Sequence, residues 1–164
     1  MTRFFQTDRS STLLFQRLVL ALVILPHGAQ KLLGWFGGYG FEGTMGYFTG
    51  TLGIPAALAV LVILGESLGA LGLAFGAFTR LSAFGVAATM AGAVFMAHAP
   101  NGFFMNWTGQ QAGEGFEYHL LALALALPLV VRGGGLFAVD TWIARWFGQA
   151  ATPASTRAPL AQAR

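Results

Sequence analysis

Residues 54–78 contain only one charged residue, Glu66, in a run of 25 that is long enough to cross a bilayer as an α-helix. A carboxylate near the bilayer centre costs about 2.5 kcal/mol even on the mildest insertion scale. Such a charge is retained only where another group pairs with it or protonates it, or where function requires it. Glu66 is therefore the first residue in the chain to consider for function or for helix packing.

The composition agrees with a membrane protein. Hydrophobic residues make up 55% of the 164 positions and charged residues 9%, whereas soluble domains carry about 25% charged residues. The net charge of +3 is too small and too scattered to indicate nucleic-acid binding. The chain has no cysteine, which excludes disulfides, thiolate-held iron–sulfur clusters and a reactive thiol on this chain.

Four apolar segments predict membrane-spanning helices at about 12–33, 54–78, 81–99 and 114–131. The basic residues flank these segments mainly on one side: Arg3, Arg9, Arg17, Arg80, Arg132, Arg145, Arg157 and Arg164. By the positive-inside rule, both termini and the turn at Arg80 are cytoplasmic. The predicted fold is all-α, an integral membrane four-helix bundle in one domain, 1–148, that crosses the membrane several times.

The connecting segments have their own character. Residues 34–53 are rich in aromatic side chains, which predicts an outer aromatic belt with a short interfacial helix near 41–49, or else an apolar lid over an outward-opening site. The triple glycine 133–135 predicts a helix stop. Residues 136–147 are expected to form an amphipathic helix on the inner surface, and 149–164 a disordered tail.

Three charged residues are predicted to share one depth in the membrane. Counted from the flanking arginines at about 1.5 Å per residue, Lys31, Glu66 and Glu117 lie about 21 to 22 Å from the inner boundary. Two carboxylates beside one lysine should pair with it, and one of them is expected to bind a proton reversibly. Lys31, Glu66 and Glu117 are thus the candidate catalytic residues. An ion pair that only fixes helix register is the alternative.

Further polar residues extend this layer. His27 and Lys31 are one helical turn apart, with Gln30 adjacent, and His119 lies at a similar depth. His27, Gln30 and His119 are therefore candidate cofactor-binding residues. The glycine series Gly65, Gly69, Gly72 and Gly76 is expected to let another helix approach closely beside Glu66.

Haem and metal are not favoured by the histidine positions. His98 lies about 27 Å from the inner boundary and His27 about 15 Å, so these two do not match as axial ligands. A haem held by His27 and His119 is compatible with their depths, but nothing else in the sequence supports it. No metal is predicted, because His27, Glu66 and His119 form no local ligand motif.

An ordered set of short motifs, covering about residues 12–144, resembles the DoxX family. The set consists of Arg17, Pro26-His27-Gly28-Ala29-Gln30-Lys31, Gly53-Ile54-Pro55, Glu66 with Gly69 and Gly76, Thr79-Arg80, His98 before Gly102-Phe103, Glu117-Tyr118, and Gly133 to Asp140. The last motif in relatives looks like Gly-Pro-Gly-Arg-Tyr-Ser-Leu-Asp. This sequence lacks its Pro, Arg and Ser.

The resemblance implies a four-helix inner-membrane protein tied to redox chemistry, since the family includes the membrane subunit of thiosulfate:quinone oxidoreductase. The leading hypothesis is a membrane subunit of a quinone-linked oxidoreductase, with quinone as the cofactor and a soluble or membrane redox subunit as the electron-supplying partner. A small proton-coupled transporter or permeability factor is one alternative. A non-catalytic membrane scaffold that recruits a redox partner is another. Lipid surrounds the chain in each case, and self-association stays open.

Overall fold

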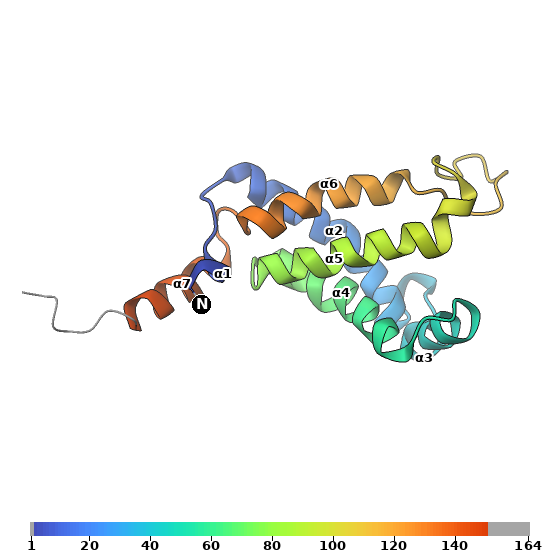
Figure 1. The fold of residues 1–164 in the computed structure, drawn as a ribbon, viewed down its shortest axis with the longest axis horizontal. Coiled ribbons are helices and arrows are strands. Elements are labelled where there is room, and N and C mark those ends of the chain that lie inside the picture. The colour runs from blue at the N-terminus through green and yellow to red at the C-terminus, as the bar shows by residue number, and fades with distance from the viewer. Residues whose placement is uncertain (1, 151–164) are drawn as a thin grey trace, which may run out of the picture.

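The computed structural model describes residues 2–150, and within this range the chain is helical and contains no β-strand (Figure 1). The longer helices are α2 (Ser11–Leu33), α4 (Ala56–Phe75), α5 (Thr79–Ala93), α6 (Glu117–Arg132) and α7 (Val139–Ala150). Short helices α1 (Thr2–Phe5) and α3 (Gly40–Gly46) lie at opposite ends of the molecule (Figure 1). π-helical turns cover Tyr47–Thr51 and Val94–His98, and 3₁₀ turns cover Trp35–Gly37 and Ala99–Asn101.

Helices α2, α4, α5 and α6 pack in a ring in which α2 contacts α4 and α6, and α5 contacts the same two helices. Three helical stretches are long and apolar enough to cross a membrane: Ser11–Leu33, Ala56–Phe75 and Thr79–Asn101. Helix α6 is shorter, with 16 residues, and packs alongside α5 (Figure 1). The prediction of an all-α membrane protein is confirmed at this level.

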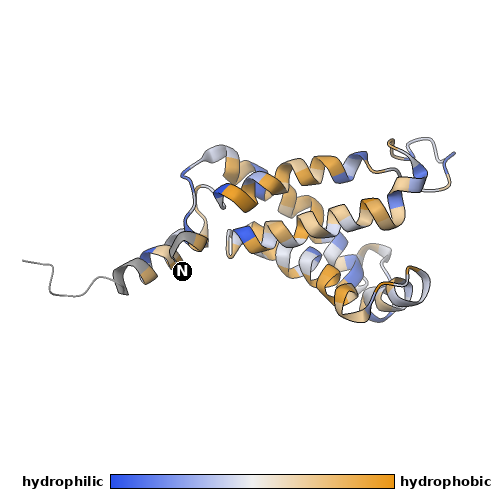
Figure 2. Ribbon diagram, in the orientation of Figure 1, coloured by the Kyte–Doolittle hydropathy of each residue, from blue (hydrophilic) through white to orange (hydrophobic). Residues whose placement is uncertain are grey.

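The packing is apolar both inside the ring and on its outer surface (Figure 2). The core consists of small and branched side chains, among them Leu20, Ile24, Leu73, Val86 and Leu129. Large apolar side chains also point outward: Leu22, Leu61 and Leu121 are each more than 60% exposed. Such a surface is unfavourable in water and suits contact with lipid chains.

The helix ends differ from the predicted ones for local reasons. Helix α4 ends at Phe75 rather than near 78, because Gly76 adopts a left-handed conformation with φ 68°. Helix α6 begins at Glu117 rather than 114, because the Phe116 and Glu117 N–H groups donate to the carbonyls of Gly102 and Phe103, at 3.2 and 2.9 Å. Helix α7 begins at Val139 rather than 136, and it continues through Ala150. The rest of the predicted tail, 151–164, lies outside the described residues.

Arg17 lies at the end of the bundle that carries α1 and α7, and it is buried there with 2% exposure (Figure 1). Its Nη1 donates to the carbonyls of Leu73 and Ala74, both at 2.8 Å, at the C-terminus of α4. Its Nε and Nη2 donate to Gly134 and Leu136, at 2.9 and 3.3 Å, in the glycine turn before α7. One side chain thus satisfies carbonyls from two distant segments, and it binds the helix end that carries partial negative charge.

Asp140 and Arg80 complete this end of the molecule. The Asp140 carboxylate accepts from the Phe78 and Thr79 N–H groups at 2.6 and 2.8 Å, so it caps the N-terminus of α5. This cap explains why α5 begins at Thr79 rather than at 81. Arg80 donates from Nη1 to the carbonyl of Val130 at 2.8 Å and also to that of Val131, both at the end of α6. Two of the arginines that flank the apolar segments, Arg17 and Arg80, therefore also cap the C-terminal ends of helices.

Arg17→Gln should lower the free energy of unfolding by about 3 kcal/mol or more, because it leaves buried carbonyls without donors. Arg17→Lys should recover only part of this loss, since an ammonium cannot reproduce the fork of donors. Thermal unfolding in detergent measures both. Arg132→Gln is the control: Arg132 pairs with Asp8 at 2.7 Å, but both side chains are more than 50% exposed, so the change should cost less than about 1 kcal/mol. Equal losses for Arg17→Gln and Arg132→Gln would contradict this role for Arg17.

Candidate functional site

Lys31 and Glu66 form an ion pair inside the bundle. Lys31 Nζ lies 2.5 Å from Glu66 Oε2, and the two side chains are 24% and 5% exposed. Lys31 comes from the last turn of α2 and Glu66 from the middle of α4. The predicted contact between these two residues is therefore present. In a pair this buried each charge compensates the other, so the loss of either partner is costly.

The backbones of α2 and α4 approach very closely beside this pair. A methyl group added at Gly28 would lie 2.7 Å from Cα of Ser67 and closer still to the carbonyl of Glu66. Ser67 Oγ donates to the Gly28 carbonyl at 3.2 Å, which adds a hydrogen bond at the same point. The predicted α4 glycine series faces a different neighbour, since a methyl group at Gly65 would lie 3.5 Å from the backbone of Gly85 in α5. Gly28 is the residue that brings Lys31 within reach of Glu66.

Glu117, the third predicted member of the layer, does not contact this pair. Its Oε1 accepts from the Met105 N–H at 2.9 Å and from Trp107 Nε1 at 3.1 Å, both in the loop before α6. A carboxylate at the first residue of a helix is also favoured by the helix dipole. The structure thus separates the predicted cluster into an ion pair between α2 and α4 and a carboxylate that holds the outer loop.

A row of rings leads from α2 across α6 to the helical stretch that follows α5. The ring centroids of His27 and Tyr118 are 6.0 Å apart, those of Tyr118 and His119 5.3 Å, and those of His119 and His98 4.2 Å. His27 is exposed on the outer surface of the bundle, whereas His119 is buried.

Two polar atoms of this row have no hydrogen-bond partner among the described residues. Tyr118 Oη and His119 Nδ1 are both buried and unpaired. A buried polar group without a partner costs about 1–3 kcal/mol, so such atoms favour binding of a group that can hydrogen-bond to them. Together with the ion pair, they give the site one charged donor, one carboxylate and two polar atoms that can take a partner.

The remaining candidates lie at the edges of the site. Gln30 donates from Nε2 to the carbonyl of Phe36 at 3.3 Å and so contacts the aromatic outer loop. His98 Nδ1 is 2.8 Å from the Glu114 carbonyl. The contact between the His98 and His119 rings leaves no space for a haem macrocycle between them. Among the described residues, no three His, Asp or Glu side chains gather as a metal site.

Sequence reasoning missed three features of this site. The approach of His98 to His119 conflicts with the depths estimated above, partly because the π-helical turn Val94–His98 places more residues in each turn than the assumed α-helix. Tyr118 was not a candidate, although its position next to His119 and one residue after Glu117 was visible. Gly28 belongs to one of the motifs given above, but only the packing of α2 on α4 explains why glycine is needed at this position.

The fold and the site define an α-helical membrane protein with a buried lysine–glutamate pair between two of its helices. The chain belongs to the DoxX family, whose model matches residues 12–99, and the resemblance seen in the sequence is thereby confirmed. It is also 25% identical over 130 residues to a Bacillus subtilis (strain 168) protein named "Putative oxidoreductase CatD", covering 79% of this chain and 85% of that protein. No solved structure matches the chain.

Glu66→Ala should lower stability in detergent by about 3–5 kcal/mol, because it leaves the Lys31 charge unpaired and partly buried. Lys31→Met should also destabilise, and the double variant should lose less than the sum of the two single losses. Thermal or denaturant unfolding of the four proteins measures this coupling. Additive losses would show that the two side chains do not interact in the membrane protein.

Gly28→Ala should destabilise the protein although alanine favours helices, because the added methyl group would force α2 away from Glu66 and Ser67. Gly92→Ala in α5 is the matched control, since a methyl group there meets no atom within 4 Å. That change should be neutral or stabilise by up to about 1 kcal/mol. The expected order of melting temperatures is Gly92→Ala at or above wild type, and Gly28→Ala clearly below it.

Proposed function

We propose that this protein is a membrane subunit of a quinone-linked oxidoreductase, and that its Lys31–Glu66 pair lies at the quinone head group. The observation that carries this proposal is the buried ion pair, with Tyr118 Oη and His119 Nδ1 buried nearby without partners. A quinone head group offers oxygen atoms on opposite sides of a ring that hydrogen-bond to such groups. The name of the Bacillus subtilis relative, which contains the word oxidoreductase, supports a redox role.

The proposed topology has four crossings, made by α2, α4, α5 and α6, in a bacterial inner membrane. Helix α6 has only 16 residues. A helix shorter than the bilayer can still cross it, because the bilayer thins locally and the flanking polar residues reach the head groups. Arg17, Arg80 and Arg132 gather at one end, which the positive-inside rule assigns to the cytoplasm. Both ends of the described chain lie on this side (Figure 1).

A quinone bound here would take up two electrons from the partner and one proton on each of its two oxygens, and it would leave as quinol. Lys31 would donate a hydrogen bond to one oxygen and stabilise the negative charge that reduction places there. Glu66, which is paired with Lys31, would take a proton from the outer side and pass it to that oxygen. Tyr118 and His119 would hold the second oxygen, and the second proton would reach it through His119, whose Nδ1 has no partner among the described residues. Glu117 keeps the outer loop in place and does not contact the head group.

Access from the lipid phase is part of the proposal. Quinones are dissolved in the membrane, so a binding site must open sideways between two helices. His27 is exposed on the outer surface of α2 with its ring facing Tyr118 of α6, and Lys31 keeps 24% exposure behind it. We propose that the head group enters between α2 and α6, past His27.

The electrons must come from a partner. The chain has no cysteine, so it has no thiolate ligands of its own for an iron–sulfur cluster. We propose a soluble or membrane redox subunit as the donor, with this chain supplying the binding site and the protons. Haem is not needed in this scheme.

Protein purified from its native membrane should retain quinone, and Glu66→Gln should lower the amount of quinone per protein at least several-fold, because the substitution removes the charge that holds Lys31 in place. Lipid extraction followed by chromatography of the extract measures the ratio. Glu42→Gln is the matched control: it makes the same chemical change at an exposed position of α3 and should leave the quinone content unchanged.

Equal quinone content in wild type and Glu66→Gln would reject the proposed site, provided that circular dichroism shows both proteins folded. If neither protein holds quinone, and wild type but not Glu66→Gln moves protons with a solute into vesicles, the ion pair belongs to a transporter instead. A loss of quinone in Glu42→Gln as well would indicate a general effect of charge rather than a site.

A further inference from the structure

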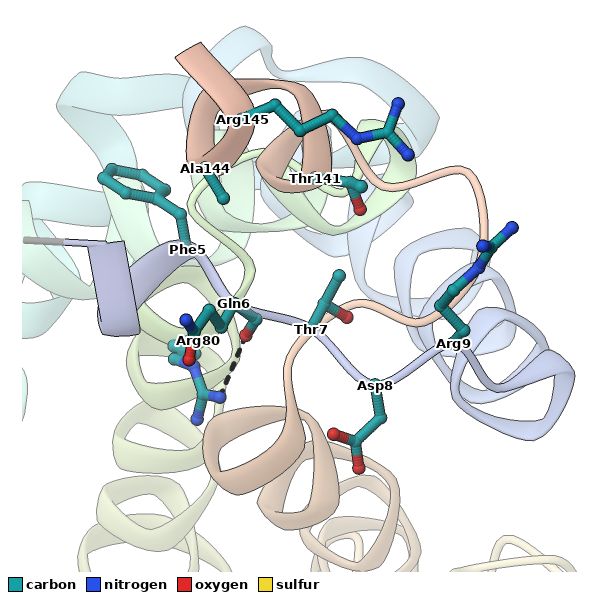
Figure 3. A pocket seen from close by; sticks show the side chains of 9 residues that line it. All are labelled: Phe5, Gln6, Thr7, Asp8, Arg9, Arg80, Thr141, Ala144 and Arg145. Atoms are coloured by element: carbon teal, nitrogen blue, oxygen red, sulfur yellow. Dashed lines mark hydrogen bonds between the residues drawn. The ribbon is translucent and has the colours of Figure 1, made fainter. Parts of the chain in front are cut away.

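An open pocket of about 520 Å³ lies at the inner end of the molecule, where the segment before α2 meets α5 and α7 (Figure 3). Three of its lining residues are arginines, Arg9, Arg80 and Arg145, and one is a carboxylate, Asp8. Hydroxyl groups from Thr7 and Thr141 line it as well. In Figure 3 the side chains of Arg9 and Arg145 extend toward the same side, with Arg80 across the pocket from them.

The positive charge of this pocket is not neutralised within the described part of the chain. Asp8 is paired with Arg132 at 2.7 Å, so it does not balance the three lining arginines. The ion pairs among residues 2–150 leave Arg9 and Arg145 without a carboxylate partner. Arg80 uses its terminal nitrogens on backbone carbonyls, including that of Gln6 at 3.0 Å, but its Nε is buried and has no acceptor. The pocket therefore contains an unused buried donor and two exposed guanidinium groups.

The position of the pocket relates it to the membrane surface. Helix α7, which forms one wall, carries Trp142 and Trp146 with 74% and 77% exposure. Exposed tryptophans of this kind are typical of the interface between lipid chains and head groups. Phe147 of α7 stacks on Phe5 of the N-terminal segment, with centroids 6.1 Å apart, so the two walls of the pocket are held together. Phosphate groups of lipids lie at the same level as such tryptophans.

We propose that Arg9 and Arg145 bind the phosphate group of an anionic phospholipid at the inner membrane surface, with the positive charge of Arg80 beside them adding to the attraction. Guanidinium groups bind phosphate oxygens through two parallel hydrogen bonds, and the hydroxyls of Thr7 and Thr141 can donate to further oxygens. The acyl chains extend beside α7, whose exposed Trp142 and Trp146 contact them. This site is separate from the Lys31–Glu66 pair and does not depend on the proposed reaction.

Native mass spectrometry of the full chain in detergent, titrated with phosphatidylglycerol or phosphatidylcholine, tests the site. Wild type should bind phosphatidylglycerol more tightly than phosphatidylcholine. The double variant Arg9→Gln/Arg145→Gln should weaken phosphatidylglycerol binding by about tenfold or more, because each arginine near a membrane surface contributes to the attraction for anionic lipid. The charge-preserving double variant Arg9→Lys/Arg145→Lys should retain part of the binding, because an ammonium keeps the charge but cannot form the two parallel hydrogen bonds.

A second variant should change the affinity for phosphatidylglycerol in the opposite direction. Asp8→Asn removes the carboxylate of the pocket and should tighten phosphatidylglycerol binding, even if the arginine variants fold poorly. A large excess of inorganic phosphate should not displace the lipid, and displacement would assign the site to a soluble phosphate and overturn the lipid assignment. Equal binding of the two lipids by wild type, or no change in both Arg9→Gln/Arg145→Gln and Asp8→Asn, would overturn the site itself.

Discussion

The inner end of the molecule depends on one buried guanidinium. Arg17 in α2 donates to the last carbonyls of α4 and to the turn before α7, and no carboxylate touches it directly. Helix ends leave carbonyls without partners, and inside a membrane no water replaces them. The Arg17 side chain supplies donors to the carbonyls of both α4 and the glycine turn, so it fixes α2, α4 and this turn relative to one another. Asp140, in turn, caps α5 from the far side of the same turn.

The opposite half of the bundle is organised differently, through close backbone contact and the Lys31–Glu66 ion pair. Gly28 lets α2 touch α4, and the contact puts Lys31 opposite Glu66. On α6, Tyr118 and His119 have buried polar atoms without partners among the described residues. The arginine network at one end thus contrasts with the opposite half of the bundle, where these polar groups are not satisfied by the described part of the protein. A ligand that hydrogen-bonds to such buried groups gains binding free energy, because it removes the cost of leaving them without partners.

Much of the fold could be predicted because the apolar runs are long and nearly free of charge, so the bilayer itself sets the positions of the helices. The Lys31–Glu66 contact followed from the similar depth of the two residues and their opposite charges. Depth could not predict the partners of Glu117. Its carboxylate accepts hydrogen bonds from N–H groups of the loop before α6, and helical spacing does not predict where a loop lies. It also could not show that Arg17 is buried, since an arginine that marks a membrane boundary and one that caps a neighbouring helix look alike in a sequence. The meeting of His98 and His119 depends on a π-helical turn, which apolar patterning does not encode.

The partners of Arg17 also impose an order of assembly. The ribosome synthesises α2 well before Leu73, and Leu73 well before Gly134 and Leu136. The carbonyls of all three residues nevertheless accept hydrogen bonds from the Arg17 guanidinium. While the chain is being inserted, this arginine must remain near the head groups or in contact with water. Only when the turn after α6 emerges can the arginine leave that environment and close the ring of helices. The last part of the bundle to be synthesised thus locks the first, and a chain truncated before Gly134 would leave its first helix inserted but without its final contacts.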